Sequence, residues 1–311
     1  MKIVLLGDTG FVGQNVAKVL NENEVSFVGA SRKNGVDLRD TERCLAFFEK
    51  EMPDIVINCA AHVGSLNYVT EQAAQIMLDN SRMILSMYEA IAKKCPQAVV
   101  INPIANCAYP AKADLFTEDN WWDGHLHRSV LPYGATRRFL WTVAESFAMQ
   151  YGIRSIHLFV PNMYGPFDST DPNKAHALNA LISKFVKAEK EKQPSIEIWG
   201  TGIAIREWLY AEDFGRIILS IIKDNCSTLG LSEPTNIAQN FGLSVKELVG
   251  IIQKNFAFSG DILWETNKPD GAPKKVMDDR RFKKVFPDFK FTPLDDGIQE
   301  TIKYYESIYP Y

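Results

Sequence analysis

The stretch MKIVLLGDTGFVG, residues 1–13, decides the fold of this chain. Residues 3–6 form a short unbroken apolar run, which is typical of a strand buried on both faces in a parallel sheet. Gly7, Gly10 and Gly13 follow at once, and apolar residues then recur with helical spacing over residues 14–20. The stretch therefore predicts a strand, a glycine turn and a helix.

The glycine turn has the properties of a pyrophosphate-binding site. A helix start offers unpaired N–H groups and the positive end of a dipole, and glycines let phosphates approach the backbone. The spacing Gly-x-x-Gly-x-x-Gly is weak by itself, and a tight turn that binds nothing is the alternative. Strands and helices alternate in the following segments, which is the setting of a dinucleotide fold. The residues expected to contact the cofactor here are Gly7, Thr9, Gly10, Phe11, Val12 and Gly13.

Length and charge limit the class of protein. The chain has 311 residues, more than one core usually holds, so we expect one large domain and a smaller companion. Hydrophobic residues make up 46% of the chain, which is enough for a core. A net charge of −4 argues against a nucleic-acid surface, so the expected ligand is a small molecule.

The cysteines and the apolar segments bear on location. The five cysteines are scattered and form no Cys-x-x-Cys pair, so we expect neither a disulfide framework nor a metal site. Free thiols indicate a reducing compartment. No apolar segment approaches membrane-spanning length, and the N-terminal run is too short for a signal peptide. The sequence therefore predicts a cytoplasmic protein without a membrane partner.

Further segments continue the alternation. Strands are predicted over residues 25–30, 55–58, 98–101 and 155–161, and helices over residues 41–51 and 133–151, with another helix around Asn80. The predicted fold class is α/β, a doubly wound parallel sheet of the Rossmann type with a second, smaller α/β domain. The regularity breaks near Asp168. We expect residues 1–167 to form the first domain, with residues 204–240 partly returning to it, and residues 168–311 to form most of the second.

The end of the second predicted strand bears on the choice of cofactor. An acidic residue at this position binds the ribose diol of NAD, whereas a basic residue accommodates the 2′-phosphate of NADP. Arg32 and Lys33 stand here, and no carboxylate follows before Asp37. This favours NADP. Two solvated loop cations are the alternative interpretation.

Chemistry is expected beyond the carboxyl ends of the other strands. Residues 59–64 are small enough for a cofactor to approach, and residues 102–110 follow the fourth strand. Tyr133 and Arg137, four residues apart, share a helix face, where the cation would lower the phenol pKa. A capped helix with an exposed arginine is the alternative. Arg206 beside an apolar strand suits a diphosphate, because a guanidinium binds phosphate oxygens in a bidentate way.

The intervening segment, residues 111–132, is polar and rich in tryptophan and histidine. We interpret it as a surface excursion that covers a substrate. His125 and His127 form a His-x-His pair, but no second group of ligands stands at recognisable spacing. We therefore expect an ordinary loop there and no bound metal.

Several of these stretches recur together in one family. They are the glycine turn, AAHVG at residues 60–64, NCAYP at 106–110, Tyr133 with Arg137, PNMYGP at 161–166, the loop ending at His176, WGTG at 199–202 with Arg206, and DGAPKK at 270–275. The chain resembles the extended short-chain dehydrogenase/reductases, and among them the NADPH-dependent enzymes that epimerise and reduce GDP-4-keto-6-deoxymannose. The likeness spans nearly the whole chain and includes PDFKFTP at residues 287–293.

The resemblance implies roles for single residues. Tyr133 would protonate O4 of the substrate while the nicotinamide delivers hydride to C4. Cys107 and His176 would exchange protons at C3 and C5, which the neighbouring ketone acidifies by stabilising an enolate. Arg206 and Lys275 would hold the GDP diphosphate. The resemblance also implies a homodimer paired through helices.

Two sets of contacts follow from the resemblance. The residues expected at the cofactor, beyond the glycine turn, are Arg32, Lys33, Ala60, Ala61, Ala105, Tyr133, Arg137, Pro161 and Met163. The residues expected at the GDP-sugar are Asn106, Asn162, His176, Lys184, Trp199, Arg206 and Lys275.

Two positions depart from the family pattern. The family has a serine at the position of Ala105 and a lysine at the position of Arg137. The serine hydroxyl helps to bind the substrate carbonyl, whereas Ala105 offers no donor, and its neighbour Asn106 points to the opposite face in extended backbone. Arg137 keeps the charge but is larger, planar and forked. Loss of one oriented donor costs roughly 3 kcal/mol of transition-state stabilisation.

These departures leave three activities open. The first is reduction of a GDP-4-keto-6-deoxy sugar, hexose or heptose, with or without epimerisation. The second is epimerisation without net reduction, with the cofactor retained as structure. The third is a catalytically inactive homologue that binds NADP.

Overall fold

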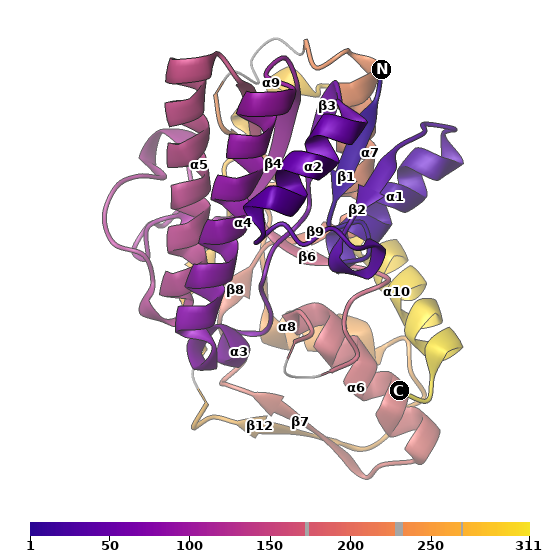
Figure 1. Cartoon of the computed structure of the whole chain (residues 1–311). Coiled ribbons are helices and arrows are strands. Elements are labelled where there is room, and N and C mark those ends of the chain that lie inside the picture. The colour runs from indigo at the N-terminus through magenta and orange to yellow at the C-terminus, as the bar shows by residue number, and fades with distance from the viewer. Residues whose placement is uncertain (172–173, 228–232, 269) are drawn as a thin grey trace.

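The computed structural model describes residues 1–171, 174–227, 233–268 and 270–311 (Figure 1). Its centre is a sheet of six strands in the order β10-β5-β4-β3-β1-β2. Their bounds are β1 Ile3–Leu6, β2 Val28–Ala30, β3 Ile55–Asn58, β4 Val99–Ala105, β5 Arg154–Val160 and β10 Thr235–Asn236. All the pairings are parallel, so every carboxyl end lies at the same edge of the sheet.

Helices cover both faces of this sheet. On one face, α1 (Phe11–Glu22) and α7 (Ala211–Lys223) share a core with alternate side chains of β1, such as Ile3 and Leu5. On the other face, α2 (Thr41–Glu51), α4 (Ala73–Lys94) and α5 (Leu131–Tyr151) pack with the alternate set, Val4 and Leu6. The predicted α/β doubly wound parallel sheet is therefore confirmed.

A second region lies beneath the carboxyl edge of the sheet (Figure 1). It has its own core around α6, α8 and α10, which includes Phe185, Leu248 and Ile298. Its elements are β6 Asn162–Tyr164, α6 Ala177–Glu191, β7 Ser195–Trp199, β8 Ile205–Arg206, β9 Trp208–Tyr210, β11 Leu243–Ser244, α8 Val245–Gln253, β12 Asp261–Glu265, β13 Lys274–Lys275 and α10 Leu294–Ile308. They form three small sheets, β11-β8-β13, β12-β7 and β6-β9.

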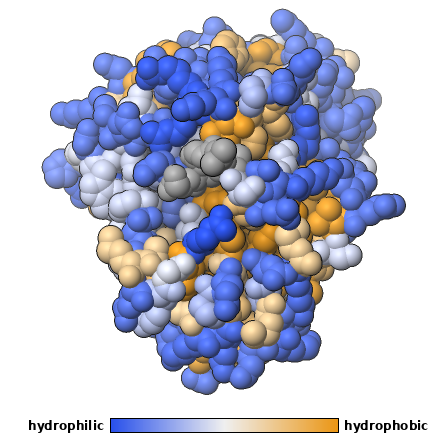
Figure 2. Space-filling model, turned by 90° about the horizontal axis from the view of Figure 1, so that it is seen from above, coloured by the Kyte–Doolittle hydropathy of each residue, from blue (hydrophilic) through white to orange (hydrophobic). Residues whose placement is uncertain are grey.

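The remaining elements are short and connect these layers. They are α3 Leu66–Glu71, α9 Arg280–Val285, and the 3-10 turns η1 Arg32–Asn34, η2 Asn106–Ala108, η3 Glu118–Asn120 and η4 Arg128–Val130. Seen from above, the end of the molecule opposite the second region is mostly hydrophilic around a smaller apolar area (Figure 2). Within the described part of the chain, no helix combines the length and apolar character that crossing a bilayer requires.

Two strands differ from their predicted bounds. β2 begins only at Val28, so the apolar residues before it lead into the strand without pairing. β4 runs on to Ala105, because its residues from Asn102 onward pair with β5. Ala105 therefore ends a strand, where a loop was predicted.

Residues 204–240 contribute to both regions. β8 and β9 belong to the small sheets, whereas α7 packs on α1 and β10 pairs with β5 at the edge of the main sheet. The division of the chain into domains at residue 167 stays a prediction.

Candidate active site

The glycine turn forms a cradle at the carboxyl end of β1. Gly7 has a φ of 75°, and a Cβ on it would meet the backbone of Cys59 and Ala60 at 2.8 Å. A Cβ on Gly13 would collide with the Gly7 carbonyl. α1 starts with neither a side-chain cap nor an acidic residue in its first turn. The space and the N–H groups therefore fit a pyrophosphate.

The other residues predicted at the cofactor lie around this cradle. Ala60 and Ala61 follow β3 after one residue, whereas Pro161 precedes β6, in which Met163 is buried. Arg32 and Lys33 form the exposed turn η1 after β2, and neither makes an ion pair with any described residue. These predicted cofactor residues therefore all follow the carboxyl ends of strands.

Tyr133 lies in the first turn of α5, directly against η2. A Cβ on Gly134 would meet the carbonyl oxygen of Cys107 at 2.5 Å, so this glycine allows the helix start to approach Cys107. Cys107 is 6% exposed. Among the described residues, nothing hydrogen-bonds the Tyr133 hydroxyl, whereas its backbone carbonyl accepts from Thr136 at 2.7 Å. The hydroxyl is thus available to a ligand.

Arg137 supports Tyr133 from within the protein. Its guanidinium lies 4.9 Å from the centroid of the Tyr133 ring, and one terminal nitrogen donates to Asn80 Oδ1 at 3.1 Å. Asn80 also accepts from the His62 N–H at 3.1 Å and donates to the His62 carbonyl at 2.8 Å. Arg137 Nε is buried and has no partner among the described residues. Asn80 therefore ties Arg137 to the loop after β3.

Tyr133, Arg137 and Cys107 together form what we call the acid/base centre. Burial controls the protonation of its two acids. It raises the pKa of Tyr133, and the opposing effect of Arg137 is smaller. The expectation that the cation would lower the phenol pKa overall was therefore wrong. Burial also raises the pKa of the Cys107 thiol, against Lys275 and Arg137. Both groups hold their protons at neutral pH, which suits a proton donor.

His176 approaches from the second region. It precedes α6, and its Nδ1 lies 3.1 Å from Asp168. Burial lowers the pKa of His176, but the attraction and hydrogen bond of Asp168 outweigh it and raise the pKa overall. The imidazole lies 5.1 Å from the Phe11 ring, at the start of α1. Within the described residues, no hydrogen bond or ion pair joins His176 to Cys107.

Arg206 and Lys275 form a cation clamp on adjacent strands. They are paired in register between β8 and β13. Arg206 donates to the carbonyl of Asp270 at 3.0 Å, and no described carboxylate forms an ion pair with Lys275. Burial lowers the pKa of Lys275, and Arg206 adds to this effect, whereas Cys107 opposes it. The clamp thus lies beside the acid/base centre, and neither of its cations forms an ion pair with a described carboxylate, although Asp270 lies close enough to oppose the lowering of the Arg206 pKa by burial.

Glu207 holds the strands of the clamp together. Its carboxylate is fully buried and accepts from the backbone N–H groups of Gln239 at 2.6 Å and Met277 at 2.8 Å. Burial raises its pKa to about 7. Its backbone carbonyl accepts from Asn162, a residue predicted at the substrate. No sequence pattern marks Glu207, because its partners lie far along the chain.

An aromatic surface continues from the clamp. Trp199 ends β7, and two cations lie near its ring. Lys184 Nζ is 5.8 Å and Lys268 Nζ is 5.4 Å from the ring centroid. Asp270 accepts from the N–H and the hydroxyl of Thr201, each at 2.7 Å, while its carbonyl binds Arg206. Asp270 therefore connects Trp199 and Lys184, both predicted at the substrate, to the clamp.

Asn106 is the predicted substrate residue next to the missing hydroxyl. The backbone is extended at Ala105 and enters η2 at Asn106, so the strict alternation of an extended strand ends there. Asn106 is 4% exposed, and its Nδ2 has no partner among the described residues. A buried unused donor thus follows Ala105.

The segment before α5 contains His127, for which the sequence predicted only an ordinary loop position. Burial lowers the pKa of His127, as do Lys275 and Arg206, which places the imidazole near the clamp. His125 is exposed. Trp121 packs into the core against Trp141 and Phe159. No group of residues suited to a metal occurs in the described part of the chain.

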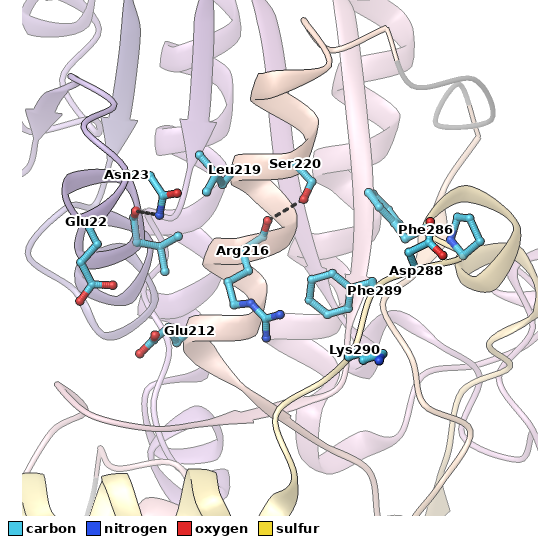
Figure 3. Close-up of a pocket in the computed structure, with 12 residues that line it drawn as sticks. Glu22, Asn23, Glu212, Arg216, Leu219, Ser220, Phe286, Asp288, Phe289 and Lys290 are labelled. Atoms are coloured by element: carbon cyan, nitrogen blue, oxygen red, sulfur yellow. Dashed lines mark hydrogen bonds between the residues drawn. The ribbon is translucent and has the colours of Figure 1, made fainter.

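A groove of about 710 Å³ lies away from these residues (Figure 3). It is bounded by the end of α1, by α7 and by residues 286–290, and none of the predicted site residues lines it. Arg216 lies 4.9 Å from the Phe289 ring and 2.7 Å from Asp213, which also accepts from the Thr292 N–H at 2.7 Å. The PDFKFTP segment thus fastens the C-terminal part of the chain to α7.

Fold and site together define a dinucleotide-binding α/β protein in which a tyrosine, an arginine and a cysteine lie next to a cation clamp. Residues 3–237 match the model of the NAD dependent epimerase/dehydratase family. The chain belongs to this family, and the resemblance noted from its motifs is confirmed.

Several relatives that are similar over nearly the whole chain are named GDP-L-fucose synthase, and one, from Yersinia pseudotuberculosis, is named GDP-L-colitose synthase. Probable GDP-L-fucose synthase 1 of Oryza sativa subsp. japonica is 27% identical, covering 98% of this chain and 92% of the relative. GDP-L-fucose synthase of Sinorhizobium fredii is 28% identical, covering 90% and 88%. The crystal structure of a GDP-L-fucose synthetase from Naegleria fowleri bound to NADP superposes with a TM-score of 0.86 at 25% identity, covering 99% of this chain and 93% of that one.

Proposed function

We propose that the chain is an NADP-dependent enzyme that epimerises and reduces a GDP-linked 4-keto-6-deoxy sugar, as GDP-L-fucose synthase does. One observation carries the proposal: Lys275 pairs in register with Arg206, and its charge lowers the pKa of the Cys107 thiol, so the acid/base centre and the cation clamp are adjacent. This arrangement would present a diphosphate-linked sugar to Tyr133. The names of the relatives support the same substrate class.

The residues divide the reaction between them. The cofactor, when bound, supplies hydride to C4 of the keto sugar. Tyr133 donates its phenolic proton to O4, and Arg137 stabilises the phenolate that remains. Cys107 and His176 remove and return protons at C3 and C5, where the ketone stabilises the enolate. Arg206 and Lys275 bind the diphosphate oxygens, and Trp199 with Lys184 lines the path to the nucleobase.

The cofactor fits the cradle at Gly7 and Gly13. A side chain at either position would collide with backbone, and the uncapped start of α1 leaves N–H groups for the pyrophosphate. Arg32 and Lys33 provide free cations for a 2′-phosphate. These features support NADP as the cofactor.

A second candidate is epimerisation without net reduction. Ala105 favours it, because the methyl group at the end of β4 cannot donate to the substrate carbonyl. The proton-exchanging residues Cys107 and His176 are both present. In that case the cofactor would serve as structure.

Two measurements on the full chain decide between these activities. NADPH absorbance is followed with GDP-linked, CDP-linked and dTDP-linked 4-keto sugars, and solvent deuterium at C3 and C5 is followed by mass spectrometry. The proposal expects NADPH oxidation with a GDP-linked sugar, together with deuterium exchange that Cys107→Ser abolishes. Exchange without oxidation selects the second candidate. Tight cofactor binding with neither signal contradicts both and identifies an inactive homologue.

We further propose that the chain is a cytoplasmic homodimer. All five cysteines are free thiols, which suits a reducing compartment. The helices α4 and α5 carry exposed apolar side chains that suit pairing with a second copy, namely Met77, Leu78, Leu85, Leu131, Met149 and Tyr151. Light scattering that gives the mass of one chain would contradict the dimer.

A further inference from the structure

An unpaired carboxylate stands where the cofactor ribose is expected. Asp8 directly follows Gly7, and its carboxylate lies against Gly29 in β2, where a Cβ would collide with it. Asn34 Nδ2 donates to Asp8 Oδ2 at 3.5 Å, which is long for a hydrogen bond. Asp8 Oδ1 is buried and has no partner among the described residues. This carboxylate thus has an unused acceptor at the end of β2.

The surrounding charges leave Asp8 uncompensated. The nearby acid Asp37 is satisfied by Arg39, which donates to it at 2.7 Å and 3.0 Å and helps to hold the pKa of Asp37 at about 2. Asp8 itself forms no ion pair with any described residue. Arg32 and Lys33 stand on the same turn as Asn34. The turn that carries the two cations therefore contacts the Asp8 carboxylate through Asn34.

We propose that Asp8 sets the cofactor preference of this chain, by accepting a hydrogen bond from the adenosine ribose and by opposing the 2′-phosphate that Arg32 and Lys33 attract. This rests on the dinucleotide site of the proposed function, but not on its sugar chemistry. In this fold an acid near the end of the second strand recognises the ribose diol. Here the acid, Asp8, comes from the glycine turn after β1, and its carboxylate reaches β2 beside Gly29.

The opposition has a definite sign. A ribose hydroxyl donates a hydrogen bond to the partly exposed Asp8 carboxylate, whose other partner is the distant Asn34 amide. A 2′-phosphate carries only acceptor oxygens and negative charge, so the same carboxylate repels it. The chain should therefore discriminate less between NADPH and NADH than its two cations alone would dictate.

The test is binding of NADPH and of NADH to the full chain without sugar, measured by fluorescence titration. Asp8→Asn keeps the shape and the contact with Asn34 while removing the charge. We expect it to raise the ratio of the NADH Kd to the NADPH Kd roughly tenfold, because one like charge near the phosphate is removed. Lys33→Ala should shift the ratio in the opposite direction.

The outcomes are separable from folding and from catalysis. Thermal unfolding without cofactor should match the wild type for Asp8→Asn, and Asp8→Ser provides a second variant without the charge. A ratio unchanged within about twofold in both variants, or one that falls, would overturn the assignment. A raised ratio stands even if no GDP-sugar is turned over, because the readout is cofactor binding alone.

Discussion

The acid/base centre and the cation clamp are neighbours, yet burial has opposite consequences for them. At Tyr133 and Cys107, burial raises the pKa and keeps each group protonated and neutral. At Arg206 and Lys275, burial lowers the pKa and therefore weakens a charge that the site needs. Loss of water thus keeps Tyr133 and Cys107 protonated for proton donation. It disfavours the charged forms of Arg206 and Lys275 until an anion binds them.

The difference indicates a division of labour between the two halves of the fold. The acid/base centre rests on long elements, β4 and α5, and its cation has a protein partner in Asn80. The clamp rests on strands of two residues, which Glu207 connects through backbone N–H groups. Under the proposed function, the acid/base centre, whose cation already binds Asn80, carries the chemistry, and the clamp, whose cations form no ion pair with a described carboxylate, binds the substrate.

The largest expected effect is the loss of the phenol. Tyr133→Phe keeps the ring above Arg137 and removes the proton donor, so the rate of NADPH oxidation should fall by about a thousandfold. Cofactor binding should not change. Single-turnover absorbance with the active GDP-keto sugar measures the rate. A rate within about tenfold of wild type would show that another group protonates O4.

The clamp should show a smaller effect with a trade-off. Lys275→Met removes a buried cation, so the Kd for GDP should rise by about a hundredfold, or roughly 3 kcal/mol. The free energy of unfolding without ligand should rise by about 1 kcal/mol, because an unpaired charge no longer has to be desolvated.

Calorimetric titration and urea unfolding measure these two quantities. The matched control is Lys274→Met, the exposed neighbour on β13, which should leave both unchanged. A variant of Lys275 that loses stability together with affinity would mean that the ammonium is satisfied by the protein.

The smallest effect concerns pH. Glu207 has a pKa of about 7 in the folded chain against an ordinary value of 4.5, so the folded state holds the proton over this interval while the unfolded state releases it. The stability is therefore fully present below pH 4.5 and is lost as the pH rises towards 7. The free energy of unfolding should fall by about 3 kcal/mol over this window.

Urea unfolding at several pH values checks the sign and the size. Glu207→Gln carries no titrating proton, so the slope between pH 4.5 and 7 should shrink, whereas Glu197→Gln, at an exposed position of β7, should keep it. An unchanged slope in Glu207→Gln would assign the pH dependence to other groups.

Much of the first half could be predicted from local sequence. β1, β3 and α2 have their predicted bounds, because a buried strand and an amphipathic helix each leave a periodic pattern in the residues themselves. Ala105 was predicted to lie in the loop after the fourth strand, but it is the last residue of β4. Its strand is extended by pairing with β5, and a pairing partner leaves no mark within the strand.

The candidate site was predictable where a motif names its own residues. Tyr133 and Arg137 lie together as their spacing required, since four residues make about one helical turn. Asp168, His127 and Glu207 were missed because each acts through a partner from another element. The direction of the Tyr133 pKa shift was also missed, because the extent of burial is not encoded in a spacing.

By itself, the sequence determined the α/β class and the glycine cradle and named the candidate proton-transferring groups, since these depend on local pattern and on side-chain chemistry. Only the tertiary structure decided which charges are paired and which are not. Asp37 has Arg39, whereas Asp8, Arg32 and Lys275 have no counter-ion among the described residues. Pairing depends on distances between segments far apart in the chain, and only the packed fold sets those distances.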